Sequence, residues 1–195
     1  MHAVLDAGAA EIGRSDAPLL PALPAAWFEA RFDADDRFGD RPTIDGRPAE
    51  AGAIARTADH PAIAAWIARS GRTLLPRLLA RLADMRAMVD AVERGAQASR
   101  TSPQANAMSA STGKGTGVAD TARGRLAHSV TVVSGRVVSW RTVAPTEWSF
   151  HPRGVVREAL LGAPADDLRR RARWIAAALD PCVPCVVGVS EDRDA

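Results

Sequence analysis

The sequence has little cysteine, little net charge and no long apolar run. Only two of its 195 residues are cysteines, too few for the disulfide framework of a small secreted domain. The 25 basic residues are nearly balanced by 23 acidic ones, which leaves a net charge of +2 and no argument for a nucleic-acid partner. No apolar stretch approaches transmembrane length, so we expect no membrane contact either.

The N-terminus lacks the basic start and the long apolar run of a signal peptide, which predicts a cytoplasmic protein. In such a reducing compartment two cysteines more often act as ligands or reactive thiols than as a disulfide. Hydrophobic residues make up 47% of the chain and charged residues 25%, the balance of a soluble globular protein.

The first part of the chain differs in composition from the rest. We expect residues 1–39 to form an Ala/Pro-rich arm followed by an acidic loop, because three closely spaced prolines prevent a regular helix (Pro18, Pro21 and Pro24). Residues 40–195 are predicted to form the main domain. Within it, residues 96–119 are rich in Ser, Thr, Gly, Asn and Gln, which predicts a loop.

That loop contains a glycine-rich run, Ser111–Gly117, that superficially resembles a phosphate-binding loop. The spacing is wrong, because the leading glycine would have to stand at Met108 and Lys114 is followed by glycine instead of Ser or Thr. We interpret the run as a mobile glycine loop.

Two helices are predicted after His60, the first starting at Pro61 and ending before Gly71. The second carries an apolar stripe at three- and four-residue intervals, which we interpret as core (Leu75, Leu78, Leu79, Leu82, Met85, Val89 and Val92). A partner-binding coiled coil is the alternative interpretation, for which the stripe is short.

The second half of the chain predicts strands and then helices. Leu126–Val133 and Arg136–Val143 are rich in β-branched residues and are separated by Ser134-Gly135, which indicates a hairpin. Short and longer helices are predicted over 155–161 and 164–179. The expected fold is α+β, mainly helical, with a small β-hairpin.

The only two cysteines, Cys182 and Cys185, follow directly after the last helix. Two thiols at this spacing form a soft bidentate ligand that suits iron, nickel or zinc. The spacing alone leaves open a structural zinc half-site or a redox dithiol.

Three motifs in order resemble the C-terminal half of the nickel-iron hydrogenase large subunit: Ala122–His128, Ala144–Phe150 and Asp180–Cys185. In that family an Arg-Gly pair opens a hairpin, a Pro-Thr-x-Trp-Asn motif follows, and a D-P-C-x-x-C motif binds the bimetallic centre. The upstream segment Asp45–Arg56 resembles the family's G-x-P-x-E-x-G-P-L-A-R. The resemblance spans roughly residues 40 to 187.

The resemblance implies a role for five residues. Cys182 and Cys185 would hold metal, and Arg123 and Thr146 occupy the positions that hydrogen-bond cyanide. A cationic donor and a hydroxyl donor suit cyanide, which is a strong acceptor. Asp180 could orient Arg123 as a supporting carboxylate. Without the resemblance, Arg123 would be interpreted as a surface residue and Thr146 as a turn residue.

The sequence also departs from the catalytic family. It has no second C-x-x-C, and Gly188 stands where the family has the histidine at its maturation cut, which implies no C-terminal processing. In this it resembles the hydrogenase expression/formation proteins of the HupK and HoxV type. The implied function is a non-catalytic maturation scaffold that transiently holds iron with cyanide and carbonyl ligands, without a complete nickel-iron centre. The implied partners are a hydrogenase maturation chaperone and the large-subunit precursor.

Two alternatives remain open. One is an enzyme: a truncated or divergent large subunit that binds nickel with cysteines from another chain. The other is a half zinc site that pairs two copies of the chain. Among the remaining candidates, His128 is expected to be a satisfied, partly buried histidine and His151 a loop residue. Three tryptophans are expected to be core or pocket walls (Trp140, Trp148 and Trp174).

Overall fold

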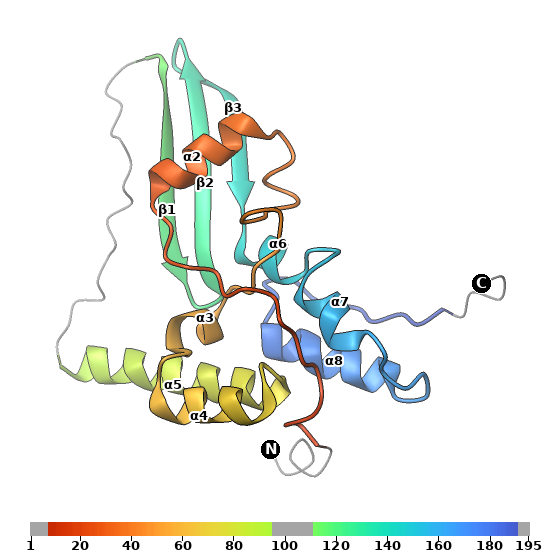
Figure 1. Ribbon diagram of the computed structural model, residues 1–195. Helices are drawn as coiled ribbons and strands as arrows, with labels where there is room; N and C mark the ends of the chain where they lie inside the picture. The colour runs from red at the N-terminus through yellow and green to blue at the C-terminus, as the bar shows by residue number, and fades with distance from the viewer. Residues whose placement is uncertain (1–7, 95–110, 191–195) are drawn as a thin grey trace.

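The computed structural model describes residues 8–94 and 111–190, which form a sheet layer and a helical layer (Figure 1). The sheet stands in the upper part of the view with one helix across its face, and the remaining helices lie below it. The helices are α2 (Ala25–Ala34), α3 (Ala53–Thr57), α4 (Pro61–Ser70), α5 (Leu74–Glu93), α6 (Pro145–Ser149), α7 (Val155–Leu160) and α8 (Leu168–Leu179). The strands are β1 (Gly113–Thr121), β2 (Gly124–Val133) and β3 (Arg136–Val143).

The predicted hairpin is confirmed as β2 and β3. These strands pair antiparallel from Ala127↔Val143 to Val133↔Arg136. Ser134 and Gly135 both have positive φ, 50° and 72°. Left-handed conformations at both central residues define the two-residue turn whose twist matches the twist of the flanking strands.

The predicted loop over 96–119 is wrong for residues 113–119, which belong to β1; residues 96–110 lie outside the described residues. Glycine is disfavoured in strands, but here every residue of β1 pairs with β2, from Gly113↔Val132 to Thr121↔Gly124. The α+β class is therefore confirmed with a three-stranded sheet larger than the expected hairpin. The expected predominance of helix is not confirmed.

The largest core lies between α2, the sheet and α6. Four aromatic side chains fill it, each at most 3% exposed: Phe28, Phe32, Phe38 and Trp148. Their rings meet edge-on, with 6.0 Å between the centroids of Phe38 and Trp148 and 5.5 Å between those of Phe32 and Phe38. Edge-to-face contacts of this kind are favourable beyond the area they bury. This core fixes α6 against the sheet.

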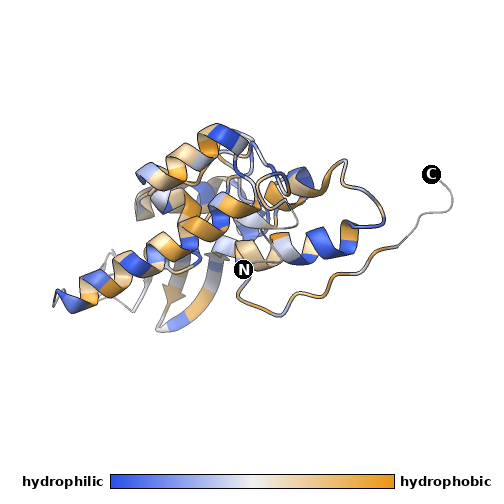
Figure 2. Cartoon of the chain, turned by 90° about the horizontal axis from the view of Figure 1, so that it is seen from below, coloured by the Kyte–Doolittle hydropathy of each residue, from blue (hydrophilic) through white to orange (hydrophobic). Residues whose placement is uncertain are grey.

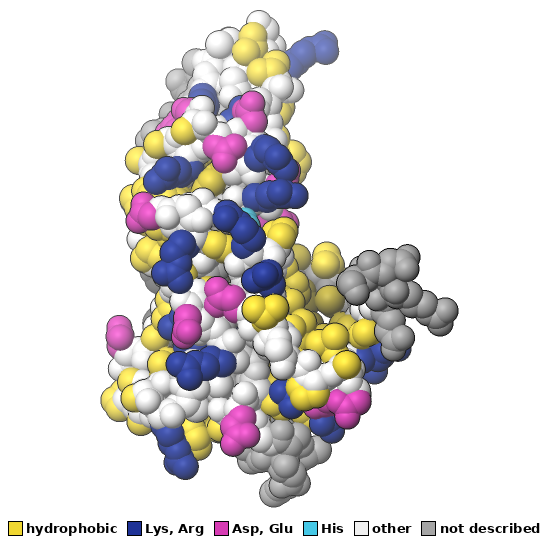
Figure 3. Space-filling model, turned by 45° about the vertical axis from the view of Figure 1, so that its right-hand side comes forward, with side chains coloured by type: hydrophobic (Ala, Val, Ile, Leu, Met, Phe, Trp, Pro, Cys, Tyr) yellow, Lys and Arg dark blue, Asp and Glu magenta, His cyan; other side chains and the backbone are white. Residues whose placement is uncertain are grey.

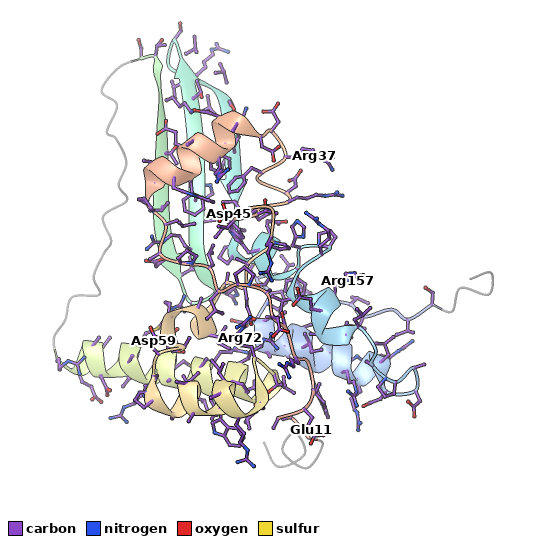
Figure 4. The ribbon with its side chains drawn as sticks, in the orientation of Figure 1. Glu11, Arg37, Asp45, Asp59, Arg72 and Arg157 are labelled. Atoms are coloured by element: carbon purple, nitrogen blue, oxygen red, sulfur yellow. The ribbon has the colours of Figure 1, made fainter. Side chains whose placement is uncertain are left out.

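The N-terminal segment, residues 8–24, is tied to the helical layer without forming a regular helix. The Glu158 carboxylate accepts hydrogen bonds from the Ser15 hydroxyl at 2.7 Å and from the backbone N–H groups of Asp16 and Ala17 at 2.9 and 3.0 Å. Arg72, near the centre of Figure 4, donates to the carbonyl of Ala17. The segment thus joins α7 to the α4–α5 connection.

The interpretation of the α5 stripe as core is correct only for its first half. Leu75 and Leu78 pack against a second core cluster, formed by Ala9, Ile12, Leu74 and Ala178. The later stripe residues are about half exposed or more: Leu82, Met85, Val89 and Val92. In Figure 2 the long helix extends beyond the body with orange and blue residues alternating along it. The stripe has a helical period throughout, but only neighbouring elements decide how much of it is covered.

The surface agrees with the small net charge. Basic and acidic side chains are interspersed over the face seen in Figure 3. Within 8–94 and 111–190, no helix combines the length and apolarity needed to cross a membrane.

The last helix, α8, starts at Leu168, four residues later than predicted, because residues 164–167 form a turn.

Candidate functional site

The structure brings the predicted residues Arg123 and Asp180 together. Arg123 Nε donates to the backbone carbonyl of Asp180 at 2.9 Å and lies 3.6 Å from its carboxylate Oδ2. Asp180 caps α8 with φ 53° and ψ 62°, the left-handed conformation. Residues in this conformation commonly end helices, and Asp tolerates it better than most. The contact joins the β1–β2 turn to the end of α8.

Gly124 determines where Arg123 lies. Its φ is +126°, and a Cβ at this position would stand 3.1 Å from both Ala51 Cβ and Gly52 N and 3.3 Å from Pro145 Cβ. Only glycine permits so close an approach of backbone segments. The β1–β2 turn is therefore packed between the start of α3 and the start of α6, and Arg123 is held beside it.

A second arginine, Arg56 of α3, holds the same turn from outside. Its guanidinium donates to the carbonyls of Ala122 at 2.8 Å and Thr121 at 3.2 Å. The same guanidinium makes a two-point contact with the Asp84 carboxylate of α5, at 3.0 and 2.7 Å. Planar Arg–carboxylate pairs of this kind fix geometry as well as charge. Arg56 thus positions the turn that carries Arg123.

A small hollow of about 20 Å³ opens at this junction, lined in part by Gly52, Arg81, Arg123 and Asp180. It has room for about one water molecule. Arg81 of α5 reaches the other oxygen of the Asp180 carboxylate, with 3.4 Å between Nη2 and Oδ1. Two guanidinium groups therefore face one carboxylate, and these three side chains together carry a net positive charge.

Sequence reasoning assigned no role to Arg81 or Arg77, and Glu50 and Arg56 entered it only as matched positions of the Asp45–Arg56 motif. Arg77 and Glu50 are 2% and 0% exposed, with Arg77 Nε donating to Glu50 Oε1 at 2.6 Å. One signal was available, because Arg77 and Arg81 are four residues apart and so share a helix face. The residues that these arginines contact lie far away in sequence, so no local spacing indicated the contacts.

Thr146 is not joined to Arg123. It is the second residue of α6 and is half-buried, and its backbone carbonyl accepts from Phe150 N at 2.8 Å. In the described part of the chain its hydroxyl makes no hydrogen bond to Arg123 or Asp180. The contact between Gly124 and Pro145 nonetheless brings the start of α6 to the turn that carries Arg123.

The two thiols lie just beyond Asp180 and are both exposed. In Figure 1 the chain runs from α8 out toward the C-terminus, away from the helical layer. Among the described residues, no cluster of three or more His, Cys, Asp or Glu side chains could hold a metal ion. Within this described part of the chain, the two thiols therefore have no further side chain of these types beside them to complete a metal site.

The other candidate residues are accounted for without a ligand. His128 Nδ1 lies 2.7 Å from Thr142 Oγ1 and accepts from Trp140 Nε1 at 3.1 Å. Trp140 is 69% exposed on the edge strand β3, so its expected place in the core is wrong, whereas Trp148 is fully buried as expected. His151 lies in the predicted loop but is buried, and its burial lowers its pKa, with smaller contributions from Arg153 and Arg41.

Comparison with known proteins shows the family of the chain. Residues 41–188 match the family model described as nickel-dependent hydrogenase, and the chain belongs to that family. It is 35% identical over 172 residues to the hydrogenase expression/formation protein HupK of Rhizobium leguminosarum bv. viciae, covering 85% of this chain and 45% of that protein. It is 36% identical over 194 residues to the expression/formation protein HoxV of Cupriavidus necator, covering 90% and 48%. The chain thus spans about half the length of these curated relatives.

Solved structures show the same fold. The nickel-iron-selenium hydrogenase of Desulfovibrio vulgaris Hildenborough in the reduced state aligns with a TM-score of 0.54 at 25% identity, covering 73% of this chain and 36% of that one. The enzyme from Desulfomicrobium baculatum aligns with a TM-score of 0.54 at 19% identity, covering 72% and 35%. At these levels the likeness concerns the fold of one part of a longer hydrogenase chain.

Proposed function

We propose that this chain acts in hydrogenase maturation as a non-catalytic scaffold that holds an iron fragment with cyanide and carbonyl ligands. The observation that carries the proposal is the bond from Arg123 Nε to the carbonyl of Asp180, two residues before Cys182. It ties the guanidinium to the residue from which the cysteine segment starts. The names of the curated relatives, which are hydrogenase expression/formation proteins, support the same role.

The residues present suit such a cargo. Cys182 and Cys185 supply two soft anionic ligands to the iron. Arg123 uses Nε for Asp180, and within the described residues neither of its Nη nitrogens has a hydrogen-bond partner. These N–H groups can donate charge-assisted bonds to cyanide, which is a strong acceptor. Thr146 would supply a weaker hydroxyl donor from α6, as the family resemblance implies.

The number of ligands points to a partner. Six-coordinate iron with three diatomic ligands has three further positions, and this chain offers two thiolates. Because the described residues place no third ligating side chain with the thiols, a thiolate from another protein fits the remaining position. We propose that the maturation chaperone delivers the fragment to this chain. The large-subunit precursor then receives it.

The test is purification without oxygen from cells that produce the maturation machinery, followed by iron analysis and infrared spectroscopy. Wild type should carry iron with cyanide and carbonyl bands, and Cys182→Ser and Cys185→Ser should lose both, since a hydroxyl is a harder and weaker ligand. Equal iron in all three proteins would refute the scaffold. Nickel in wild type would favour the truncated large subunit instead, and zinc retained in a dimer would favour the paired half-site.

A further inference from the structure

One side chain that neither the motifs nor the proposed function assigns, Arg81, contacts the residue from which the cysteine segment departs. Its Nη1 donates to the carbonyl of Ala177 at 2.7 Å, and its Nη2 lies 3.4 Å from Oδ1 of Asp180. The Ala177 carbonyl belongs to the last turn of α8, where carbonyls have no partner within the helix. A cation there also interacts favourably with the helix dipole.

Asp180 needs such support because of its backbone conformation. It is one of three non-glycine residues with positive φ in the described chain, at 53°. Side chains disfavour this conformation, which persists where surrounding contacts impose it. Three contacts impose it here: its own N–H to Ala176 O at 3.1 Å, its carbonyl to Arg123, and its carboxylate shared between Arg123 and Arg81.

No described residue after Asp180 helps to hold the start of the cysteine segment in place. Between residues 181 and 190 no hydrogen bond or ion pair ties the backbone or the side chains to the described body of the protein. The direction in which Cys182 and Cys185 leave the fold is therefore set at Asp180.

Other arginines of α5 cannot replace Arg81. Arg77, one turn earlier, is buried and bound to Glu50 and to the carbonyl of Gly13. Arg86, later on the helix, pairs with Asp90 at 2.7 Å and its side chain is 75% exposed. Of these three arginines, Arg81 is the one that links α5 to the end of α8.

We propose that Arg81 is a positioning residue that holds Asp180 in its left-handed conformation, and so fixes where the cysteine segment begins relative to Arg123. It acts through Asp180 and not on the cargo. The guanidinium suits this task because its planar fork reaches the Ala177 carbonyl and the Asp180 carboxylate at the same time. Lysine, a single point donor, can hold only one of the two well.

The first test uses the purified full chain and does not depend on iron. Amide hydrogen exchange around Asp180 is compared in wild type, Arg81→Met, Arg81→Lys and the matched control Arg86→Met. We expect exchange at the Asp180 amide to quicken about tenfold in Arg81→Met, less in Arg81→Lys and not at all in Arg86→Met. The thermal midpoint should stay within about 2–4 °C of wild type, because Arg81 is partly exposed. Unchanged exchange at Asp180 in Arg81→Met would overturn the proposal.

The second test rests on the proposed function. In protein loaded with the iron fragment, Arg81→Met should shift or broaden the cyanide stretching bands, whereas Arg86→Met should leave them as in wild type. Bands that stay sharp and unmoved in Arg81→Met would mean that the segment keeps its place without Arg81. If wild type itself carries no such bands, the scaffold function fails, and the exchange measurement still decides the role of Arg81.

Discussion

Arg77 and Glu50 form a buried two-point ion pair, with Nε–Oε1 at 2.6 Å and Nη2–Oε2 at 3.0 Å. Both residues line the hollow at which Arg123 and Asp180 meet. It also connects α5 with the segment before α3, and Arg77 reaches the N-terminal segment through the carbonyl of Gly13. The site is therefore built on three segments that this one pair holds together.

Breaking that pair should be strongly destabilising. In Arg77→Met the buried Glu50 carboxylate keeps only the more distant Arg72 Nε, at 3.9 Å, as a cationic partner. The variant should therefore lower the free energy of unfolding by about 3–5 kcal/mol in urea titrations. The control is Arg86→Met, which breaks an exposed pair with Asp90 and should cost at most about 1 kcal/mol. A loss in Arg77→Met no larger than the control would contradict a structural role for the pair.

Gly124 should tolerate no side chain. In Gly124→Ala the new Cβ would meet Gly52 N and Ala51 Cβ at 3.1 Å in addition to an unfavourable φ of +126°. We expect a loss of about 2–4 kcal/mol in unfolding free energy from strain and overpacking together. Gly162→Ala separates the two effects, since Gly162 has φ +75° and a Cβ added there would meet no described atom within 4 Å. Equal losses in both variants would show that close packing at Gly124 contributes nothing.

His151 should make stability depend on pH. Burial holds its pKa below the ordinary value of about 6.5, and its Nδ1 accepts a hydrogen bond from Arg153 N at 3.0 Å, which requires that nitrogen to be unprotonated. The unfolded chain therefore binds a proton more readily than the folded one. Its contribution to stability is complete above about pH 6.5 and falls as the pH drops toward the lowered pKa of the folded state.

The measurement is the unfolding free energy between about pH 7.5 and 5 in wild type and His151→Asn. Asparagine can accept the same local bond without titrating, so the variant should lose part of the decline toward low pH. Parallel curves for the two proteins would exclude His151 as the titrating group.

The inner and outer ends of α5 should respond differently to truncation. Leu74→Ala removes a side chain that is 1% exposed and should lower the unfolding free energy by about 2–5 kcal/mol. Val89→Ala removes one that is 50% exposed and should change it by no more than about 0.5 kcal/mol. Comparable losses would mean that the outer half of the helix is covered in solution.

Arg123 and Thr146 should differ in their effect on a bound iron fragment. A charge-assisted hydrogen bond contributes about 1.5–3 kcal/mol and a neutral one about 1 kcal/mol. Arg123→Ala should therefore shift the cyanide stretching frequencies more than Thr146→Val does. Frequencies that neither substitution moves would refute both assignments.

The sequence by itself determined the features whose causes are local. Ser134-Gly135 specified the hairpin turn, because two consecutive left-handed residues fit only a few side chains. Pro61 marked the start of α4, because the fixed φ of proline suits the first helical position. Asp180-Pro181 marked the end of α8, because proline cannot continue a helix. The order of the motifs along the chain also indicated the family.

Only the tertiary structure decided the features that depend on distant neighbours. The glycine-rich run became β1 because β2 supplies every one of its partners, which outweighs glycine's low strand propensity. The outer half of the α5 stripe stayed exposed because no described element packs on it. Arg81 and Arg56 entered the site through contacts with residues 28 to 99 positions away in sequence. Periodicity and turn signals act over a few residues, whereas an ion pair depends on which elements the whole chain brings side by side.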